Sequence, residues 1–296
     1  MKLLIIFNPN AAYGRSASKL AGIKAKFDSL AINTKFIPTT HPGHGSELVA
    51  NMELSGFDGL VAAGGDGTVF EVLNGLYKHP KSARIPLGLL PIGTGNAFAR
   101  DFGLSLDTWP EAIDLLHRGG TRLIDVGRVQ TTAKTYYFLN IVGMGFSVDA
   151  GKSAQKLKFF GNTAYTLATL WQVLQLKSYP LVIEIGAESI RNDTVFVSIS
   201  NSRYTGTHFL IAPEAVIDDG LLDVTILENL SRIRLLKLFP TIYTGRHIEY
   251  KEISTHQAAC INIHSPQGML LSPDGEFLGS TPAQITCLHQ DLTIFS

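Results

Sequence analysis

A short glycine-rich segment that follows an apolar run places the strongest limit on how this chain can fold. The run Val61–Ala63 leads into Gly64-Gly65-Asp66-Gly67, and a helical pattern begins at Thr68. Glycine lets the backbone turn sharply and lets amide groups approach an anion without a Cβ atom in the way. A helix N-terminus adds N–H groups and a partial positive charge. The segment predicts a strand–loop–helix unit that binds a di- or triphosphate; an ordinary turn, with Asp66 capping the helix, is the alternative.

Similar glycine-bearing loops follow the other apolar runs of the first 125 residues. Strands are expected at Leu3–Phe7, Lys35–Ile37, Gly59–Ala63 and Leu87–Leu90. Helices are expected between them at Ser16–Leu30, Ser46–Leu54, Thr68–Tyr77 and Trp109–His117. Apolar strands that alternate with helices indicate a parallel sheet covered on both faces. Because ligands bind at the carboxyl ends of such strands, we expect four loops to converge on one edge: Asn8–Arg15, Thr39–Gly45, Gly64–Thr68 and Pro91–Asn96.

From Arg122 onward the pattern changes to short alternating or apolar runs, which predict an antiparallel, strand-rich region. Strands are expected at Thr135–Val142, Leu181–Ile185, Val195–Ser200, Leu222–Leu227, Ala259–His264 and Ile285–Leu288. Two helices are expected at Ala154–Leu176 and Ser231–Tyr243. We therefore predict an α/β nucleotide-binding domain with a parallel sheet over residues 1–125, followed by a β-rich, sandwich-like domain over residues 126–296. The active site is expected in the cleft between the domains, and the extreme C-terminus is left free to pack back on the first.

Composition narrows the class of protein. The 25 basic and 25 acidic residues give a formal charge of zero, so nucleic acid is not an expected partner. No window offers the roughly 18 unbroken apolar residues of a spanning helix, and the run Leu3–Phe7 is too short for a secretory signal. Cys260 and Cys287 are expected to be reduced core residues rather than a disulfide. These features indicate a cytoplasmic protein.

Acidic residues mark three further candidate positions. Asp66 would repel a phosphate unless a cation lay between them, so we assign it to Mg²⁺. Asp274-Gly275-Glu276 places two carboxylates where one could accept the proton of an attacking hydroxyl. A hairpin turn is the alternative there, because Pro-Asp-Gly is a common turn sequence. Asp218-Asp219-Gly220 is open to the same two interpretations, a turn or an oxygen-rich metal site.

Taken in order, these motifs resemble the diacylglycerol kinase catalytic domain family, which includes small bacterial lipid kinases and the sphingosine and ceramide kinases. The resemblance covers nearly the whole chain, through Gly64–Thr68, Asn74-Gly75, Gly93–Asn96, Asp125–Gly127, Ala212–Ala215, Asp218–Asp223 and Asp274–Glu276. It implies an enzyme that transfers the γ-phosphate of ATP to a lipid hydroxyl, with a diacylglycerol-type acceptor as the first expectation. It also implies Mg²⁺ as a cofactor, the second domain as the lipid-substrate domain, and peripheral association with the inner face of the membrane. A homodimer is left open.

The resemblance also implies roles for individual residues. Contacts to ATP are expected from loop residues Asn8, Asn10, Ala11, Ala12, Tyr13, Gly14, Thr39, Gly64, Gly65, Asp66, Gly67, Thr68, Gly93, Thr94 and Asn96. Magnesium-linked carboxylates are expected at Asp66 and Asp125, and a structural metal at the Asp219 carboxylate with the carbonyls of Val216 and Leu221. The catalytic base would be Asp274, supported by Glu276. Many members of the family carry an aspartate where this chain has Ala97.

Two other functions compete with a lipid kinase. An NAD kinase shares the glycine–glycine–aspartate element, but the second threonine- and glycine-rich motif usual in such enzymes is not found here. A non-catalytic nucleotide-binding regulator would keep the same fold; Asp274 and Glu276 argue against it, whereas Ala97 leaves it open.

A stretch without acidic residues lies between Asp149 and Glu184. It carries aromatic side chains, among them Trp171, and the basic residues Lys152, Lys156, Lys158 and Lys177. A basic, aromatic segment suits an anionic membrane surface. A helix packed on the second domain with solvated lysines is the alternative.

Overall fold

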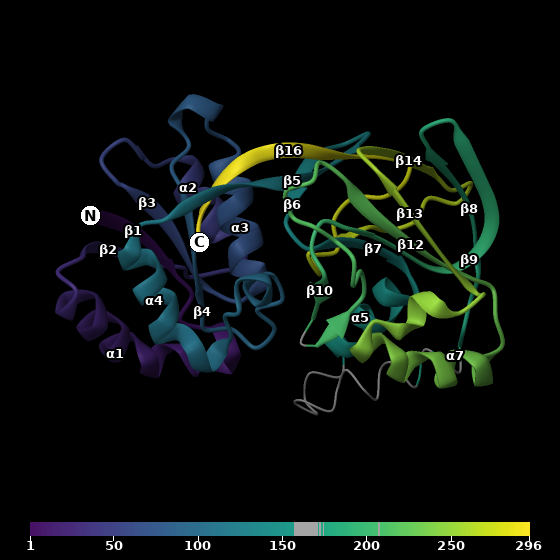
Figure 1. Cartoon of the computed structure of the whole chain (residues 1–296), viewed down its shortest axis with the longest axis horizontal. Coiled ribbons are helices and arrows are strands. Elements are labelled where there is room, and N and C mark those ends of the chain that lie inside the picture. The colour runs from purple at the N-terminus through teal and green to yellow at the C-terminus, as the bar shows by residue number, and fades with distance from the viewer. Residues whose placement is uncertain (157–170, 172, 174, 207) are drawn as a thin grey trace. The chain divides into compact units, whose positions relative to one another are not determined.

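A computed structural model describes residues 1–156, 171, 173, 175–206 and 208–296 of the chain (Figure 1). The chain divides into two compact units, each described here by itself. The first unit contains Met1–Val126 and His289–Ser296, and the second contains Gly127–Leu288. The chain passes from one unit to the other in strand β5 (Thr121–Thr131) and returns in strand β16 (Ala283–Phe295).

The first unit is built on a parallel sheet with strand order β4-β3-β1-β2. These strands are β1 (Lys2–Phe7), β2 (Asn33–Pro38), β3 (Gly59–Gly64) and β4 (Leu87–Pro91). The helices between and after them are α1 (Ser16–Ser29), α2 (His44–Ala50), α3 (Asp66–Leu76) and α4 (Trp109–Arg118). Short 3₁₀ turns lie at η1 (Ala11–Gly14), η2 (Lys81–Ala83), η3 (Phe98–Phe102) and η4 (Leu106–Thr108).

Continuous burial explains why the apolar runs of the first unit become central strands. Every residue of β3 and β4 is buried, as is β1 after Lys2. Strands covered on both faces read as continuous apolar runs, whereas strands with one wet face alternate. The predicted α/β unit with a parallel sheet is confirmed. The last residues of β16 extend this sheet, because Ile294 pairs in parallel with Leu87 of β4.

The second unit is a β-rich, sandwich-like fold in which the strand pairs are antiparallel. Its strands, besides parts of β5 and β16, include β6 (Thr135–Phe138), β7 (Ile141–Gly145), β8 (Tyr179–Ile185), β9 (Glu188–Ser200), β10 (Tyr204–Thr205), β11 (Phe209–Leu210), β12 (Leu222–Glu228), β13 (Ile253–Ala258), β14 (Cys260–His264) and β15 (Ser272–Pro273). Its helical segments include α5 (Phe146–Lys156), α7 (Arg232–Leu238), η6 (Phe239–Thr244) and η7 (Arg246–Glu249). The predicted antiparallel character is confirmed.

Two details of the sequence prediction are wrong. The segment Thr135–Val142 is not one strand: it breaks after Phe138, and β7 starts at Ile141. The break follows from hydrogen bonding, because the amides of Leu139 and Asn140 donate to a carboxylate instead of to a neighbouring strand. Cys260 is exposed rather than part of the core, although Cys287 is buried and neither cysteine is in a disulfide.

Most of the predicted helix Ala154–Leu176 lies outside the described residues, including Lys158 and the other residues of 157–170. Among the helices that the structure describes, none is both long and apolar enough to cross a membrane.

Candidate active site

Two glycine loops of the first unit pack backbone against backbone. A Cβ atom added to Gly93 would lie 2.3 Å from the Cα atom of Gly65, and one added to Gly64 would lie 2.1 Å from the Thr68 hydroxyl oxygen. The amides of Ile92 and Gly93 both donate to the Gly64 carbonyl at 3.0 Å. The loops after β3 and β4 are therefore packed directly on each other, and glycine is required where their backbones meet.

Asn96 fixes the shape of the loop after β4. Its side chain accepts a hydrogen bond from the Gly93 amide at 3.1 Å and donates one to the Gly93 carbonyl at 2.7 Å. The residue is buried and has φ 51°, a left-handed backbone that asparagine tolerates better than most residues. Thr94, between the two glycines, remains exposed. The Asn96 side chain thus holds the loop so that Thr94 is presented to solvent.

Asn8 joins the loop after β1 to the loop after β3. Its side-chain nitrogen donates to the Thr68 hydroxyl at 3.0 Å, and its side-chain oxygen accepts from the Asn10 amide at 3.0 Å. Its own amide donates to the Ala63 carbonyl at 2.9 Å. Three of the four predicted loops are therefore in direct contact at the carboxyl edge of the sheet.

The loop after β1 contains consecutive left-handed residues. Ala12, Tyr13 and Gly14 have φ values of 51°, 60° and 83°. A non-glycine residue held in this region costs on the order of 1–3 kcal/mol, and such strain collects at ligand-binding sites. Successive N–H groups in turns of this kind can form a concavity that binds anions. The Tyr13 side chain is 68% exposed, so packing of the ring does not account for the strain.

The loop after β2 differs from the other three. Thr39 is buried at the end of the strand, where its amide donates to the Phe7 carbonyl at 2.8 Å. Further along, the amides of Gly43 and Gly45 donate to the Glu71 carboxylate at 2.7 and 2.9 Å. Glu71 lies on α3, and the sequence reasoning did not single it out. Because this carboxylate occupies both glycine amides, this part of the loop does not offer them to a phosphate.

Asp66 links two of the loops instead of capping its own helix. One carboxylate oxygen accepts hydrogen bonds from the Ala97 amide at 2.7 Å and the Phe98 amide at 3.4 Å. Burial raises the pKa of Asp66 to about 6, while the two amides and the positive charge of Arg100 act in the opposite direction. A bound cation would also favour the ionised form. Ala97 stands where many members of the family carry an aspartate. Its backbone amide is thus one of the two donors that hold the Asp66 carboxylate.

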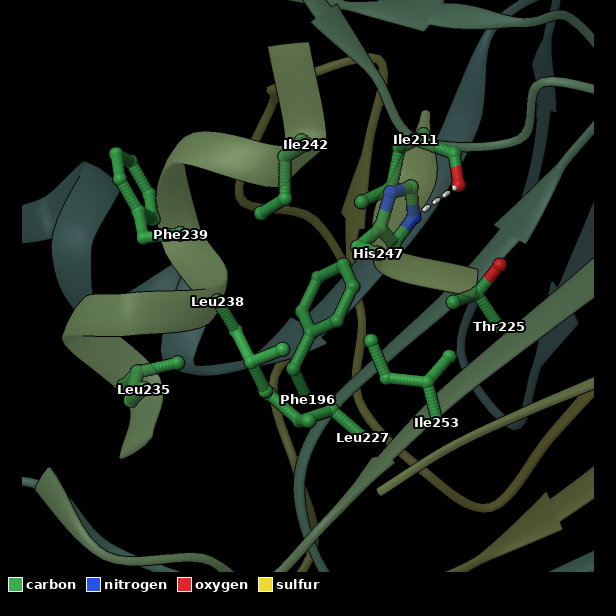
Figure 2. A pocket seen from close by; sticks show the side chains of 10 residues that line it. All are labelled: Phe196, Ile211, Thr225, Leu227, Leu235, Leu238, Phe239, Ile242, His247 and Ile253. Atoms are coloured by element: carbon green, nitrogen blue, oxygen red, sulfur yellow. Dashed lines mark hydrogen bonds between the residues drawn. The ribbon is translucent and has the colours of Figure 1, made fainter. Parts of the chain in front are cut away.

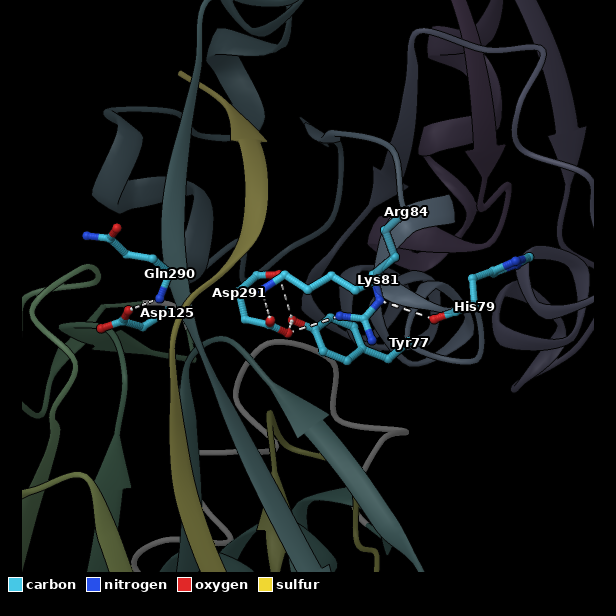
Figure 3. A network of polar contacts seen from close by, with 7 residues as sticks. All are labelled: Tyr77, His79, Lys81, Arg84, Asp125, Gln290 and Asp291. Atoms are coloured by element: carbon cyan, nitrogen blue, oxygen red, sulfur yellow. Dashed lines mark hydrogen bonds and ion pairs between the residues drawn. The ribbon is translucent and has the colours of Figure 1, made fainter.

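Asp125 is fully buried at the point where β16 enters the first unit. One carboxylate oxygen accepts the Gln290 amide at 2.6 Å and lies 3.0 Å from Nδ1 of His289. Gln290 itself has a left-handed backbone with φ 48°. Figure 3 shows the hydrogen bond between Gln290 and Asp125. It also shows a second network, in which Asp291 accepts hydrogen bonds from the Tyr77 hydroxyl and from Arg84, each at 3.0 Å.

The metal roles predicted for Asp66 and Asp125 stay predictions. Within the described ranges, no cluster of three or more His, Cys, Asp or Glu side chains could hold a metal ion. An ion near Asp66 would therefore need further oxygen ligands from water, backbone carbonyls or a bound phosphate, the arrangement usual for Mg²⁺.

In the second unit, Asp274 lies in a tight turn that follows β15. Asp274 and Gly275 have φ 47° and 89°, and the Glu276 amide donates to the Pro273 carbonyl at 2.8 Å. Two residues with positive φ at the centre of a turn define type I′. The turn interpretation of the Pro-Asp-Gly sequence is therefore correct for the backbone, and Glu276 is exposed.

The Asp274 carboxylate is held by amides of the break between β6 and β7. It accepts hydrogen bonds from the amides of Leu139, Asn140 and Ile141 at 3.0, 2.9 and 3.1 Å. The Asp274 amide in turn donates to the Ile141 carbonyl at 2.8 Å. Three N–H donors stabilise a carboxylate anion and fix its orientation. The half-buried side chain is thus a hydrogen-bond acceptor with a fixed orientation. Its role as the catalytic base stays a prediction.

Asp219 forms a local turn, since one carboxylate oxygen accepts the Leu221 amide at 2.9 Å. Val216 is 47% exposed in the same loop. Burial raises the pKa of neighbouring Asp223 to about 6, and the negative charges of Asp219 and Glu214 add to this effect although a hydrogen bond from Gln257 opposes it. The loop therefore concentrates negative charge that a cation would relieve, and the metal role of Asp219, Val216 and Leu221 stays a prediction.

Comparison with known proteins first defines the class. Residues 2–129 match the model of the diacylglycerol kinase catalytic domain, and residues 140–296 match that of the YegS C-terminal NAD kinase beta sandwich-like domain. A diacylglycerol kinase of Mycobacterium tuberculosis is 32% identical over 99% of this chain and 94% of its own length. One from Bacillus subtilis is 29% identical over 98% of this chain and 94% of its own length.

A solved structure of a provisionally assigned diacylglycerol kinase from Bacillus anthracis superposes with a TM-score of 0.81. It is 26% identical, and the match covers 99% of this chain and 96% of that one. The chain belongs to the diacylglycerol kinase family.

Proposed function

We propose that this protein is an ATP-dependent lipid kinase that transfers the γ-phosphate of ATP to the hydroxyl of a diacylglycerol-type lipid. The observation that carries the proposal is the contact among the loops after β1, β3 and β4, centred on Gly65 and Gly93, in a chain of the diacylglycerol kinase family. Open α/β sheets bind ligands at this edge. Full-length similarity to proteins named diacylglycerol kinase favours a lipid acceptor over other alcohols.

The loops suit the triphosphate of ATP. The start of helix α3 brings N–H groups and the positive end of the helix dipole next to Gly64 and Gly65. The left-handed turn Ala12–Gly14 adds amides that can face an anion. Thr94 is exposed at the tip of the loop after β4, where its hydroxyl is free to reach a bound ligand from solvent. These residues would bind and orient the phosphates, and orientation provides most of the catalysis in phosphoryl transfer.

Mg²⁺ would be held near Asp66, and it would neutralise phosphate charge when bound. We propose Asp125 as a positioning residue for this region, because its carboxylate fixes β16 through the Gln290 amide. The Asp219 loop is proposed as a separate structural cation site, since its carboxylates repel one another.

Asp274 is proposed to accept the proton of the lipid hydroxyl. Its carboxylate accepts hydrogen bonds from three backbone amides, which fix its orientation. A carboxylate suffices for this step because the proton of the attacking hydroxyl leaves late in phosphoryl transfer. Glu276, exposed and two residues away, is proposed as a supporting charge.

An NAD kinase activity is the second candidate, and the description of the matched β-sandwich model motivates it. The whole-chain relatives are named for diacylglycerol, which favours the lipid. The test is incubation of the protein with labelled ATP, Mg²⁺ and one acceptor at a time: diacylglycerol, ceramide, sphingosine or NAD. Label in phosphatidic acid is expected; label in NADP would overturn the lipid assignment.

A lipid acceptor also implies that the enzyme acts at a membrane surface. We propose peripheral association with an anionic leaflet, because diacylglycerol resides in the bilayer and the enzyme must reach its hydroxyl group.

A further inference from the structure

Helix α7 of the second unit has two chemically different faces. At about 100° per residue, Arg232, Leu236, Ile233 and Lys237 follow one another around one side of the helix. Arg234, Leu235 and Leu238 fall on the other side. We refer to the first four residues as the α7 outer face; it spans an arc of about 140° at 3.6 residues per turn.

The inner side of α7 is fixed to the unit. Leu235 and Leu238 are 4% and 3% exposed and belong to an apolar cluster with Val195 and Leu227. Figure 2 shows Leu238 beside Phe196 in the small cavity between the helix and the strands. Its volume is about 30 Å³, room for roughly one water-sized group. The helix thus lies on a nearly filled core.

An ion pair further fixes the orientation of α7. The Arg234 guanidinium donates to both carboxylate oxygens of Glu252, at 2.7 and 3.1 Å. The Ser231 side chain caps the helix by accepting the Arg234 amide at 3.3 Å. Arg234 is therefore turned toward the protein, and the direction in which the outer face points is set by these contacts.

The α7 outer face places large apolar side chains in the solvent. Ile233 is 69% exposed and Leu236 is 46% exposed, and both lie between the exposed residues Arg232 and Lys237 on the helical wheel. A central apolar stripe with basic residues at both edges is typical of helices that lie in a membrane interface. The apolar stripe would enter the acyl boundary while the basic edges meet lipid headgroups.

The segment that follows α7 continues this character. Tyr243, in η6, is 51% exposed, with its ring centroid 5.2 Å from that of Phe209 and 6.4 Å from that of Phe239. Tyrosine is enriched where apolar and aqueous phases meet. Between Asn229 and Ile248 the sequence carries four basic residues and no acidic one. Arg234 pairs with Glu252 and Arg246 with Glu249, whereas Arg232 and Lys237 are exposed at the two edges of the α7 outer face. The charge of the outer face is therefore complementary to an anionic leaflet.

We propose that the α7 outer face, together with Tyr243, docks the second unit on the surface of an anionic lipid bilayer. The inference deepens the proposed lipid kinase function, on which it rests for the choice of a bilayer as partner. It assigns the contact to residues 232–243, distinct from the segment between Asp149 and Glu184, for which the sequence left a membrane contact and packing on the second domain both open.

Binding to vesicles of phosphatidylglycerol and phosphatidylcholine, measured by co-sedimentation without ATP or diacylglycerol, tests the proposal. Arg232→Gln with Lys237→Gln should weaken binding about 25-fold, since each basic residue near an anionic surface contributes about 1 kcal/mol. The matched control, Lys78→Gln with Arg118→Gln, changes the net charge equally on exposed residues of the first unit. It should change binding no more than about twofold, because the proposal assigns the contact to residues 232–243 of the second unit.

The apolar part is tested by Ile233→Gln with Leu236→Gln, for which we expect about tenfold weaker binding. Leu123→Gln is the control, as Leu123 is 47% exposed in the first unit. All of these side chains are exposed, so unchanged melting temperatures should accompany the effects. Vesicle binding equal to wild type in both α7 variants would overturn the proposal. A second result would also overturn it: the Ile233/Leu236 variant loses self-association but keeps its vesicle binding. A second copy of the chain would then be what covers the α7 outer face.

Activity measurements separate this proposal from the proposed function. The α7 variants should phosphorylate dispersed short-chain diacylglycerol at the wild-type rate and lose activity toward long-chain diacylglycerol in vesicles. Absence of wild-type activity toward both forms would contradict the lipid kinase function, while vesicle binding would still decide the docking surface.

Discussion

At the scale of single residues, Asp274 joins a structural role to a proposed chemical one. Its carboxylate fills the break between β6 and β7, and its backbone adopts the left-handed turn that the sequence Pro-Asp-Gly favours. Sequence could predict the turn, because Asp and Gly carry that preference locally. It could not predict the three amide donors, since they lie more than 130 residues earlier in the chain.

Asp274→Asn separates these two roles. The amide keeps the size of the side chain but removes the charge and brings an NH₂ group toward backbone N–H donors. We expect the free energy of unfolding to fall by about 1–3 kcal/mol, and turnover by about 100- to 10,000-fold. ATP affinity, measured by calorimetry, should change little because the nucleotide loops belong to the first unit. Glu276→Gln, at an exposed site, is the control and should cost less. Near-normal turnover in folded Asp274→Asn would remove this residue from the mechanism.

The buried carboxyl group of Asp66 makes the stability of the protein depend on pH. Its pKa, raised by burial to about 6, lies above the ordinary aspartate value, so the folded state binds its proton more tightly than the unfolded state. The stability that this proton contributes is present at low pH and is lost as the pH rises through about 6.

Asp66→Asn should remove that dependence. In the presence of a chelator, the variant should gain stability relative to wild type between pH 5 and pH 7, on the order of 1 kcal/mol. Thermal unfolding at both pH values measures this. In wild type, Mg²⁺-dependent ATP binding should weaken as the pH falls through about 6, because protonated Asp66 no longer favours a cation. A constant stability difference across this range would show that Asp66 does not titrate between pH 5 and pH 7, which would contradict the prediction.

At the scale of elements, continuous apolar runs were the most reliable guide. Strands β1, β3 and β4 were predicted within two residues because burial on both faces leaves no ambiguity in their pattern. Contacts between loops were harder to foresee. Gly65 and Gly93 were recognised as loop glycines, but their mutual backbone contact and the bond from Gly43 to Glu71 depend on tertiary structure.

Gly93→Ala tests the contact between these loops. The added Cβ atom would lie 2.3 Å from the Gly65 Cα atom, so the loops must separate. We expect ATP affinity to fall at least tenfold, with stability reduced by about 1–3 kcal/mol. Gly56→Ala is the matched control in the same unit, since the nearest atom to its Cβ is 3.9 Å away. Equal ATP affinity in the two variants would show that the loop contact does not shape the nucleotide site.

At the scale of the whole molecule, the two-part division follows from a change of hydrophobic period near Arg122. The sequence did not reveal the length of β16, of which only Ile285–Leu288 was predicted as strand. This strand of 13 residues contributes to both units, and its polar middle at His289–Asp291 interrupts the apolar pattern. Two residues from elsewhere in the chain pair with this polar middle: Asp125 accepts the Gln290 amide, and Arg84 donates to the Asp291 carboxylate.

The central claim is that the chain phosphorylates a membrane lipid with ATP. The most direct measurement is the initial rate of label transfer from ATP to diacylglycerol in anionic vesicles, beside an equal concentration of NAD. We predict Mg²⁺-dependent formation of phosphatidic acid, loss of that product in Asp274→Asn, and no label in NADP. Label in NADP, or binding of ATP without transfer to any lipid class, would contradict it.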